Sequence, residues 1–228
     1  MGRKSLANER RAEIAHGLYR CIAKRGYANT SVRDIAKEAN IGLGMITHYF
    51  KSKEEILYVM TENTYKRYWK MFMLFSRKHQ KKAVRERLRL SLEFLFMRVA
   101  GDKEKSRVFR ELMNISQHDE YLLEFLREHY RKYRALVAEA LLEMLPDQDR
   151  EDTPIRDLSA FLVAATEGAA LLCCVEPRRI SLKRLSSIAT RLVDSMLENE
   201  HCEADRSVIK GKGNGGSGGQ RFARGGLR

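Results

Sequence analysis

Polar side chains suited to contacting a nucleic acid gather in the first quarter of the chain. Thr47, His48 and Tyr49 follow one another in a short segment of apolar periodicity, and each can hydrogen-bond a base edge or a phosphate oxygen. Leu43 and Met45, just before them, offer only apolar contacts such as those to a thymine methyl group. This mixture of side chains is typical of the face of a helix that enters the major groove.

The sequence offers no comparable evidence for an enzyme. The six histidines are scattered, and we find no nucleophile and base pair, no phosphate-binding loop and no Cys or His spacing suited to zinc. We therefore predict no catalytic residue, no metal site and no cofactor. The four cysteines form no CxxC pair and no secretory signal peptide is recognisable, which predicts a cytoplasmic protein.

The excess positive charge lies at the two ends of the chain. The 228 residues carry a formal net charge of +13. Residues 1–53 hold 11 Lys and Arg against 4 Asp and Glu, and residues 206–228 hold 6 against none, so the stretch between them is neutral. Such an asymmetry indicates binding to a nucleic acid or to an anionic membrane surface.

Two short helices joined by a tight turn would position the polar side chains. Ser31 and Asp34 make a capping-box pattern that opens the first helix. Its apolar positions end at Asn40, a residue that tolerates the left-handed conformation of a turn. A second helix follows at 43–50, and a longer one precedes both at 9–24. This spacing predicts a helix-turn-helix.

The remaining segments also have helical periodicity, and none combines period-two alternation with β-branched residues. We predict an all-α fold of about nine helices, with a three-helix head followed by an antiparallel bundle. The bundle helices are expected at 53–78, 83–100, 104–117, 120–145, 154–175 and 182–199. The predicted domains are a DNA-binding head at 1–52, an effector-binding and dimerisation domain at 53–200, and a disordered basic Gly-rich tail at 201–228.

One stretch raises the alternative of a membrane span. Residues 158–175 have roughly the minimum length for a transmembrane helix, but Glu167 lies near their centre and interfacial anchors are missing. We predict a fully buried bundle helix and no membrane partner.

Residues 31–57 closely resemble the DNA-binding signature of the TetR/AcrR family of transcriptional regulators. They read SVRDIAKEANIGLGMITHYFKSKEEIL, with Gly44, Tyr49 and Lys53 in register, and the resemblance extends over about 9–57. Three positions depart from the signature, because Gly42 replaces the usual hydroxyl cap, Asn40 a turn glycine and Thr47 a phosphate-binding tyrosine.

The resemblance implies a homodimeric regulator, usually a repressor, that binds double-stranded DNA. Its bundle would bind an unknown small-molecule effector and thereby change the separation of the two heads. The resemblance also implies which residues contact the DNA. Backbone contacts would come from Thr30, Ser31 and Arg33, groove contacts from Leu43, Gly44, Met45, Thr47, His48 and Tyr49, and a phosphate contact from Lys53.

Large apolar side chains at helical spacing predict the bundle core, and the resemblance adds a ligand cavity within it. The candidate ligand-binding residues are Trp69, Phe72, Phe75, Phe96, Phe109, Arg110, Met113, Asn114 and His118. Residues 109–138 resemble the bundle of the family's choline-responsive branch. The last two helices are the predicted dimer interface, through Phe161, Ala165, Gly168, Ala169, Leu185, Ile188 and Leu192, with burial inside the monomer as the alternative.

The leading hypothesis is a ligand-responsive repressor that binds a pseudo-palindromic operator as a homodimer. The alternative is a sequence-tolerant nucleic-acid-binding protein, architectural or RNA-directed, in which the Gly-rich arm dominates binding. Survival of operator preference after removal of residues 206–228 would distinguish the two.

Overall fold

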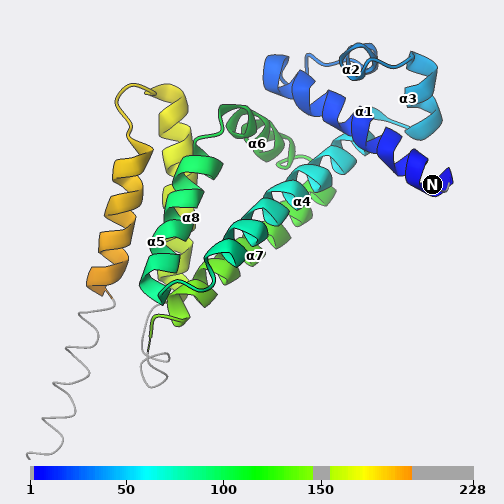
Figure 1. Ribbon diagram of the computed structural model, residues 1–228. Coiled ribbons are helices and arrows are strands. Elements are labelled where there is room, and N and C mark those ends of the chain that lie inside the picture. Colours follow the sequence, from blue (N-terminus) through cyan, green and yellow to red (C-terminus); the bar gives the residue numbers. More distant parts are fainter. Residues whose placement is uncertain (1–2, 146–154, 197–228) are drawn as a thin grey trace, which may run out of the picture.

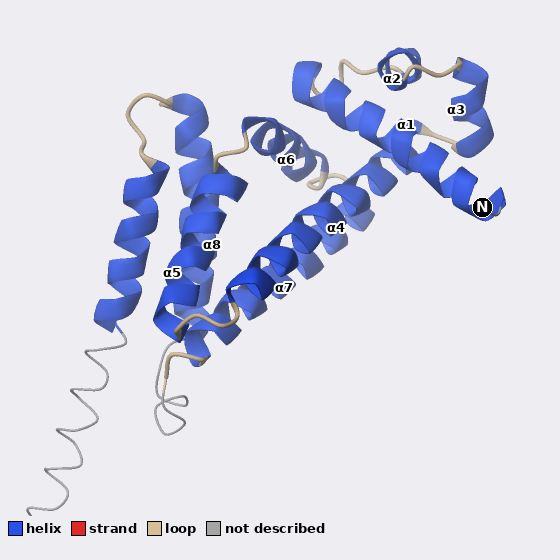
Figure 2. Cartoon of the chain, viewed as in Figure 1, coloured by secondary structure: helices blue, strands red, loops and turns tan. Residues whose placement is uncertain are grey.

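The computed structural model describes residues 3–145 and 155–196, and every regular element within them is a helix (Figure 2). The predicted all-α fold is confirmed. The head comprises α1 (Arg3–Arg25), α2 (Val32–Ala39) and α3 (Leu43–Tyr49). The bundle comprises α4 (Lys53–His79), α5 (Val84–Phe94), the π-helix η1 (Leu95–Ala100), α6 (Lys103–Ile115), α7 (Glu120–Leu142), α8 (Ile155–Val175) and a helix at 182–196. The predicted tail at 201–228 lies outside the described residues.

Local capping signals define the helices of the head. The Ser31 hydroxyl accepts the backbone N–H of Asp34, and the Asp34 carboxylate accepts the N–H of Ser31, which completes the predicted capping box. Asn40 ends α2 in the left-handed conformation, with φ of 55°. Gly42 precedes α3 without a side-chain cap. In the head, α1 begins at Arg3 and not at the predicted residue 9. The prediction began later because the first two turns of the helix contain few apolar residues.

The long helix α4 runs from the head into the bundle, where it lies beside α7 (Figure 1). At its start the Ser52 hydroxyl accepts the Glu55 N–H at 3.2 Å. The Glu55 carboxylate accepts the N–H of Lys51 at 2.8 Å instead of closing the box on Ser52. The cap therefore ties α4 to the end of α3 and fixes the direction in which the head leaves the bundle.

The core of the head continues into α6 and α7. Ile14, Leu18 and Ile46 belong to the same buried cluster as Val108 and Leu122. A second cluster fills the far end of the bundle and includes Val193 from the helix at 182–196. Head and bundle thus share one packed interface, so a shift of α6 would displace side chains in the head core.

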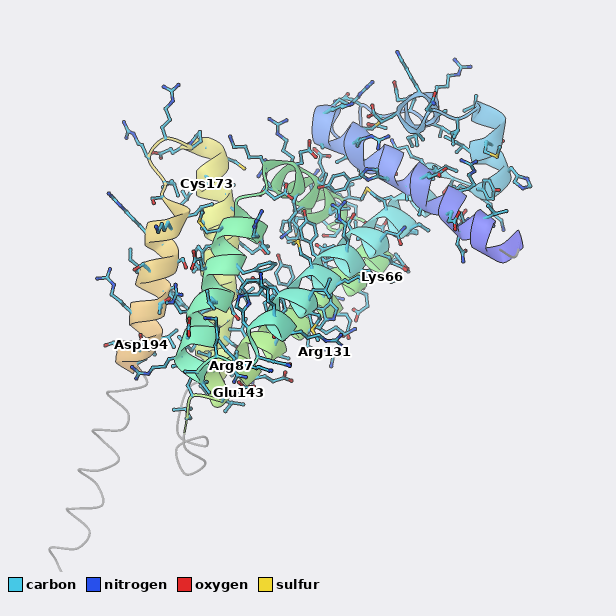
Figure 3. All side chains as sticks on the ribbon, viewed as in Figure 1. Lys66, Arg87, Arg131, Glu143, Cys173 and Asp194 are labelled. Atoms are coloured by element: carbon cyan, nitrogen blue, oxygen red, sulfur yellow. The ribbon has the colours of Figure 1, made fainter. Side chains whose placement is uncertain are left out.

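The far end of the bundle is held by ion pairs between helix termini. Arg87 of α5 pairs with Glu143, which follows α7, and Arg85 reaches Asp194 of the helix at 182–196 at 3.9 Å (Figure 3). The predicted helix at 83–100 is one rod, but its second half is a π-helix. Such segments are frequent at functional sites.

The helix α8 is buried on one face only, which corrects the expectation that it is buried all round. By length and composition alone it could span a membrane, and 39% of its most apolar stretch is buried inside the structure. Leu158 and Leu162 lie in the core, whereas Phe161, Leu171 and Val175 are exposed. The second face is apolar and uncovered in the monomer.

Candidate nucleic-acid interface and ligand cavity

The outer face of α3 is free to meet a partner. Leu43 and Met45 are 41% and 43% exposed, and Thr47 and His48 are exposed beside them. Ile46, on the opposite side, is buried with the head core. The Thr47 hydroxyl donates to the Gly44 carbonyl at 3.0 Å and keeps its lone pairs for an outside donor. The structure thus brings together the groove-facing residues predicted from sequence, with Tyr49 half-buried at the end of the face.

Ion pairing in the head leaves a few cations without a carboxylate. The carboxylates of Glu13, Asp34, Glu38 and Glu55 all pair with lysines or arginines of α1. Among the residues that the structure describes, Arg33, Lys37 and Lys51 are exposed and have no ion pair. Arg33 and Lys37 lie on α2 and Lys51 follows α3, so all three can neutralise phosphates beside the exposed face of α3. Ser31 is exposed as well, at the N-terminus of α2.

Thr30 and Lys53 face into the head instead of toward solvent. Thr30 is 3% exposed and its hydroxyl donates to the Gly26 carbonyl at 2.7 Å. The Lys53 ammonium donates to the carbonyls of Tyr27 and Thr30 at 2.9 and 2.8 Å, and it lies 3.9 Å from the centre of the Tyr27 ring. Both side chains stabilise the turn between α1 and α2. Their effect on a DNA contact would be indirect in this arrangement.

Arg11 is a residue of the head that sequence reasoning missed. Its guanidinium donates to the Tyr49 carbonyl at the end of α3 and to the Glu55 carboxylate at 2.8 Å, and it covers the Phe50 ring at 4.1 Å. A single side chain of α1 thus joins the end of α3 to the start of α4. Arg11 lies 38 positions from Tyr49 and 44 positions from Glu55 in the chain, and contacts over such separations leave no pattern in a sequence.

A cavity lies inside the bundle and is lined by residues of α4, α6, α7 and α8 and of the rod formed by α5 and η1. Its enclosed part has a volume of about 60 Å³. It adjoins a cleft of about 270 Å³ between α6 and α8, with Lys105 and Glu167 at the junction, and a groove of about 690 Å³ between α4 and α7. The residues that line the enclosed part are Tyr65, Tyr68, Trp69, Phe72, Phe94, Leu95, Val99, Lys105, Phe109, His129, Tyr133, Leu136 and Glu167.

The sequence found part of this lining. Trp69, Phe72 and Phe109 line the cavity as predicted, and Arg110 lines the adjoining cleft. Phe96 is instead buried in the core and Phe75 packs on Phe94, outside the lining. Met113, Asn114 and His118 are exposed. Met113 and Asn114 lie on the solvent side of α6 and His118 lies in the turn after it, so none of the three lines the cavity or the adjoining cleft.

The missed residues include the charged groups of the cavity. Burial lowers the pKa of the Lys105 ammonium, and the nearby Glu167 and Asp102 oppose this effect. Burial raises the pKa of Glu167, against the influence of Lys105 and of a hydrogen bond from the Tyr130 hydroxyl. The signal for Glu167 was visible, because a glutamate in an apolar helix requires a partner. Lys105 carried no comparable signal.

His129 gives a testable link between the cavity and stability. Burial, with help from Lys105 and Lys132, lowers its pKa from 6.5 to about 4. Between about pH 6.5 and 4, His129 is therefore protonated in the unfolded chain and neutral in the folded chain. The free energy of unfolding should fall over this window as pH decreases, by at most about 3 kcal/mol.

Urea unfolding of the wild type and of His129→Phe at several pH values measures this effect. The phenyl ring preserves the packing on Tyr65, whose ring centre lies 3.9 Å from that of His129. We expect the variant to show a shallower pH dependence between pH 4 and 6.5, while replacement of the exposed His118 by glutamine leaves it unchanged. An unaltered pH dependence in His129→Phe would contradict the assignment.

The predicted dimer residues divide between the monomer core and its surface. Ala169 is buried in the core, and Ala165, Leu185 and Leu192 are half-buried. Phe161 and Ile188 are more than half exposed. An added Cβ at Gly168 would meet no atom within 4 Å. The apolar residues on this face of α8 recur at helical spacing and form one stripe, which consists of the exposed Phe161, Ala164, Leu171, Leu172 and Val175 and the half-buried Gly168.

Helix α6 connects the cavity to the head. Its N-cap Asp102 accepts the Tyr68 hydroxyl at 2.5 Å, beside Lys105 in the cavity lining. Two turns further on, the Glu111 carboxylate accepts the Tyr27 N–H at 3.2 Å. Gly26, which follows α1, has the left-handed φ of 81° that favours glycine. This conformation brings the backbone after α1 close to the Glu111 carboxylate.

Comparison with known proteins places this architecture. A model described as bacterial regulatory proteins, tetR family, matches residues 14–59, and one described as BetI-type transcriptional repressor, C-terminal, matches 84–198, about half of the chain. The regulator PksA of Bacillus subtilis is 45% identical over 49 residues, which span 22% of this chain and 24% of PksA. The regulator BetI of Burkholderia lata is 22% identical over 84% of this chain and 95% of its own length.

Solved structures share the fold. A transcriptional regulator of Saccharomonospora viridis in complex with choline superposes with a TM-score of 0.68 at 19% identity, over 82% of this chain and 96% of its own. The regulator FadR of Bacillus subtilis in complex with stearoyl-CoA gives 0.65 at 22% identity, over 79% and 96%. The chain therefore belongs to the TetR family of bacterial transcriptional regulators, with a C-terminal domain of the BetI type.

Proposed function

We propose that this regulator is a repressor that binds a pseudo-palindromic operator as a homodimer and is released by a small-molecule effector. The observation that carries the proposal is the exposed face of α3, flanked by the unpaired cations Arg33, Lys37 and Lys51. A helix with apolar and hydroxyl groups outward, bordered by cations, matches the requirements of the major groove and of the phosphates beside it.

The groove contacts would come from Leu43, Gly44, Met45, Thr47 and His48, with Tyr49 at the edge. Ser31 and Arg33 would contact the backbone. Thr30 and Lys53 would support these contacts by holding the turn between α1 and α2, since both are hydrogen-bonded inside the head. The stripe on α8 would pair two copies, because it is the apolar face that the monomer leaves uncovered.

Effector response would use the cavity and α6. A ligand that moves Lys105 also moves the helix that holds Tyr27 through Glu111, at the junction with the head. Proteins with this fold have been crystallised with choline and with stearoyl-CoA, which supports a ligand-binding role for the bundle. The relatives reported above are transcriptional regulators, and none supports the architectural or RNA-directed alternative.

A gel-shift titration against genomic fragments, repeated with competitor DNA and after removal of residues 206–228, tests the proposal. A preference for one palindrome that survives the truncation is the expected result. Equal affinity for all fragments would overturn it.

The salt dependence of binding tests the cationic border. Replacing both Arg33 and Lys51 with alanine should weaken binding to all sequences and reduce the slope of log affinity against log salt by about 2, because each phosphate contact contributes about 0.9. The control is Lys66→Ala on α4, whose ammonium pairs with Glu62 at 2.8 Å away from the head (Figure 3). An unchanged slope in the double variant would remove these cations from the interface.

A further inference from the structure

The cavity holds polar groups that the protein does not pair. The hydroxyls of Tyr65 and Tyr133 are buried without a hydrogen-bond partner. The Thr166 hydroxyl donates to the Leu162 carbonyl at 2.9 Å and lies close to the Tyr133 hydroxyl, so Tyr65 is the one of the two that has no neighbouring hydroxyl within hydrogen-bond distance among the described residues. Buried polar groups left unpaired are costly. Their occurrence together in one cavity indicates that something from outside completes their hydrogen bonds.

Lys105 adds a positive charge to the same cavity. Its ammonium lies 4.8 Å from the centre of the Tyr68 ring, and no carboxylate of the described residues comes within 4.0 Å of it. Asp102 is occupied as the cap of α6 and as the acceptor of the Tyr68 hydroxyl. An ammonium can only donate hydrogen bonds, so its missing partner is an acceptor.

The ring of Tyr68 is already in contact with a cation of the protein itself. An aromatic cavity is the usual site for a quaternary ammonium ligand. Here such a ligand would bring a second positive charge beside Lys105, which is unfavourable because both charges are partly withdrawn from water. The aromatic lining of this chain thus disfavours a cation.

Glu167 does not reverse this preference. Its carboxyl group lines the cavity with Lys105 but forms no ion pair with the ammonium, and burial raises its pKa against the opposing influence of Lys105 and of a hydrogen bond from the Tyr130 hydroxyl. Because Glu167 forms no ion pair with Lys105, the ammonium remains accessible to the carboxylate of a ligand.

The remaining walls are apolar. Phe72, Phe94 and Phe109 line the enclosed part, and the cleft between α6 and α8 continues it with Val99 and Ala170. The enclosed part, at about 60 Å³, holds little more than a small polar group. A ligand must therefore extend from Lys105 along the apolar walls into the adjoining cleft.

We propose that the effector is a hydrophobic carboxylic acid bound as its anion, with the carboxylate at the Lys105 ammonium and the tyrosine hydroxyls, and the hydrocarbon part along Phe109 and the cleft between α6 and α8. This proposal rests on the proposed function only in taking the cavity as the effector site. It names a class of ligand that the resemblance to relatives does not provide.

Calorimetric titration of the full-length protein with three probes that share one heptyl chain tests the charge preference. Octanoate, octanamide and heptyltrimethylammonium carry the same hydrocarbon chain with negative, neutral and positive ends. We expect octanoate to bind about 10-fold more tightly than the other two, as is typical for one hydrogen-bonded charge. Phenylacetate serves as a second carboxylate of different shape.

Variants then assign the preference to one side chain. Lys105→Met should lower octanoate affinity about 10-fold and leave octanamide within about 3-fold, whereas Glu167→Gln should retain or strengthen octanoate binding. Lys103→Met is the matched control, since this exposed lysine lies two residues earlier on α6 and outside the enclosed cavity. The melting temperature of Lys105→Met should stay the same or rise, because a desolvated ammonium is removed.

Equal or tighter binding of heptyltrimethylammonium or octanamide would overturn the proposal. So would unchanged octanoate affinity in Lys105→Met, or failure of both octanoate and phenylacetate to bind. Each of these results can occur while the protein still selects one palindromic operator, so the ligand class can fail without the proposed function. Loss of operator selection in the wild type would instead refute the proposed function itself.

Discussion

Replacing Gly168 with glutamate should give a monomer in place of a dimer and lower operator affinity about 100-fold or more, because a monomer loses the avidity of two linked heads. Gly168 lies within the exposed apolar stripe of α8, between Phe161 and Leu171. A side chain there fits the monomer, since an added Cβ meets no atom within 4 Å. In a helix-to-helix dimer the same side chain would separate the two stripes and bury a charge.

The conservative variant Gly168→Ala separates this effect from folding. Both substitutions replace a glycine in a helix, which favours the helix by about 0.5–1 kcal/mol. We expect both proteins to melt at or above the wild-type temperature. Only the glutamate variant should show the mass of a monomer in light scattering and lose operator binding in a gel shift. A dimeric Gly168→Glu with full affinity would place the dimer interface elsewhere.

The head could be predicted from the sequence because its signals are local. The Ser31 cap, the left-handed Asn40 and the inward position of Ile46 each depend on neighbours within a few residues. Local chemistry of this kind survives without knowledge of the tertiary fold. Thr30 shows the limit, since its hydroxyl also fits a phosphate contact and only the close Gly26 carbonyl decides its direction.

The cavity could be predicted only in part because several helices build it. Periodicity indicates that Phe72 and Phe96 are both buried, but the packing angle of the helices decides that one lines the cavity and the other fills the core. The residues around Lys105 give no local signal that separates it from a solvated charge near the start of a helix. Its contact with Tyr68 and its approach to Glu167 join residues far apart in the chain.

Arg11 joins parts of the head that are far apart in the sequence. Replacing it with alanine should lower operator affinity about 10-fold and the free energy of unfolding by about 2 kcal/mol, the usual cost of losing hydrogen bonds to a charged group. The Tyr49 carbonyl and the Glu55 carboxylate would lose their shared donor. The end of α3 would then be free to move relative to α4, so the groove-facing side chains would no longer be held in one orientation.

Two further variants decide whether the guanidinium itself is responsible. Arg11→Lys keeps the charge but cannot donate to Tyr49 and Glu55 with one planar group, so its affinity should fall between those of wild type and alanine variant. Arg10→Ala removes the neighbouring arginine, which pairs with Glu13 at the surface, and should change little. Chemical denaturation and gel shifts measure both quantities. If Arg10→Ala and Arg11→Ala weaken binding equally, the loss comes from net charge, and the link between α3 and α4 has no part in presenting the DNA-binding face.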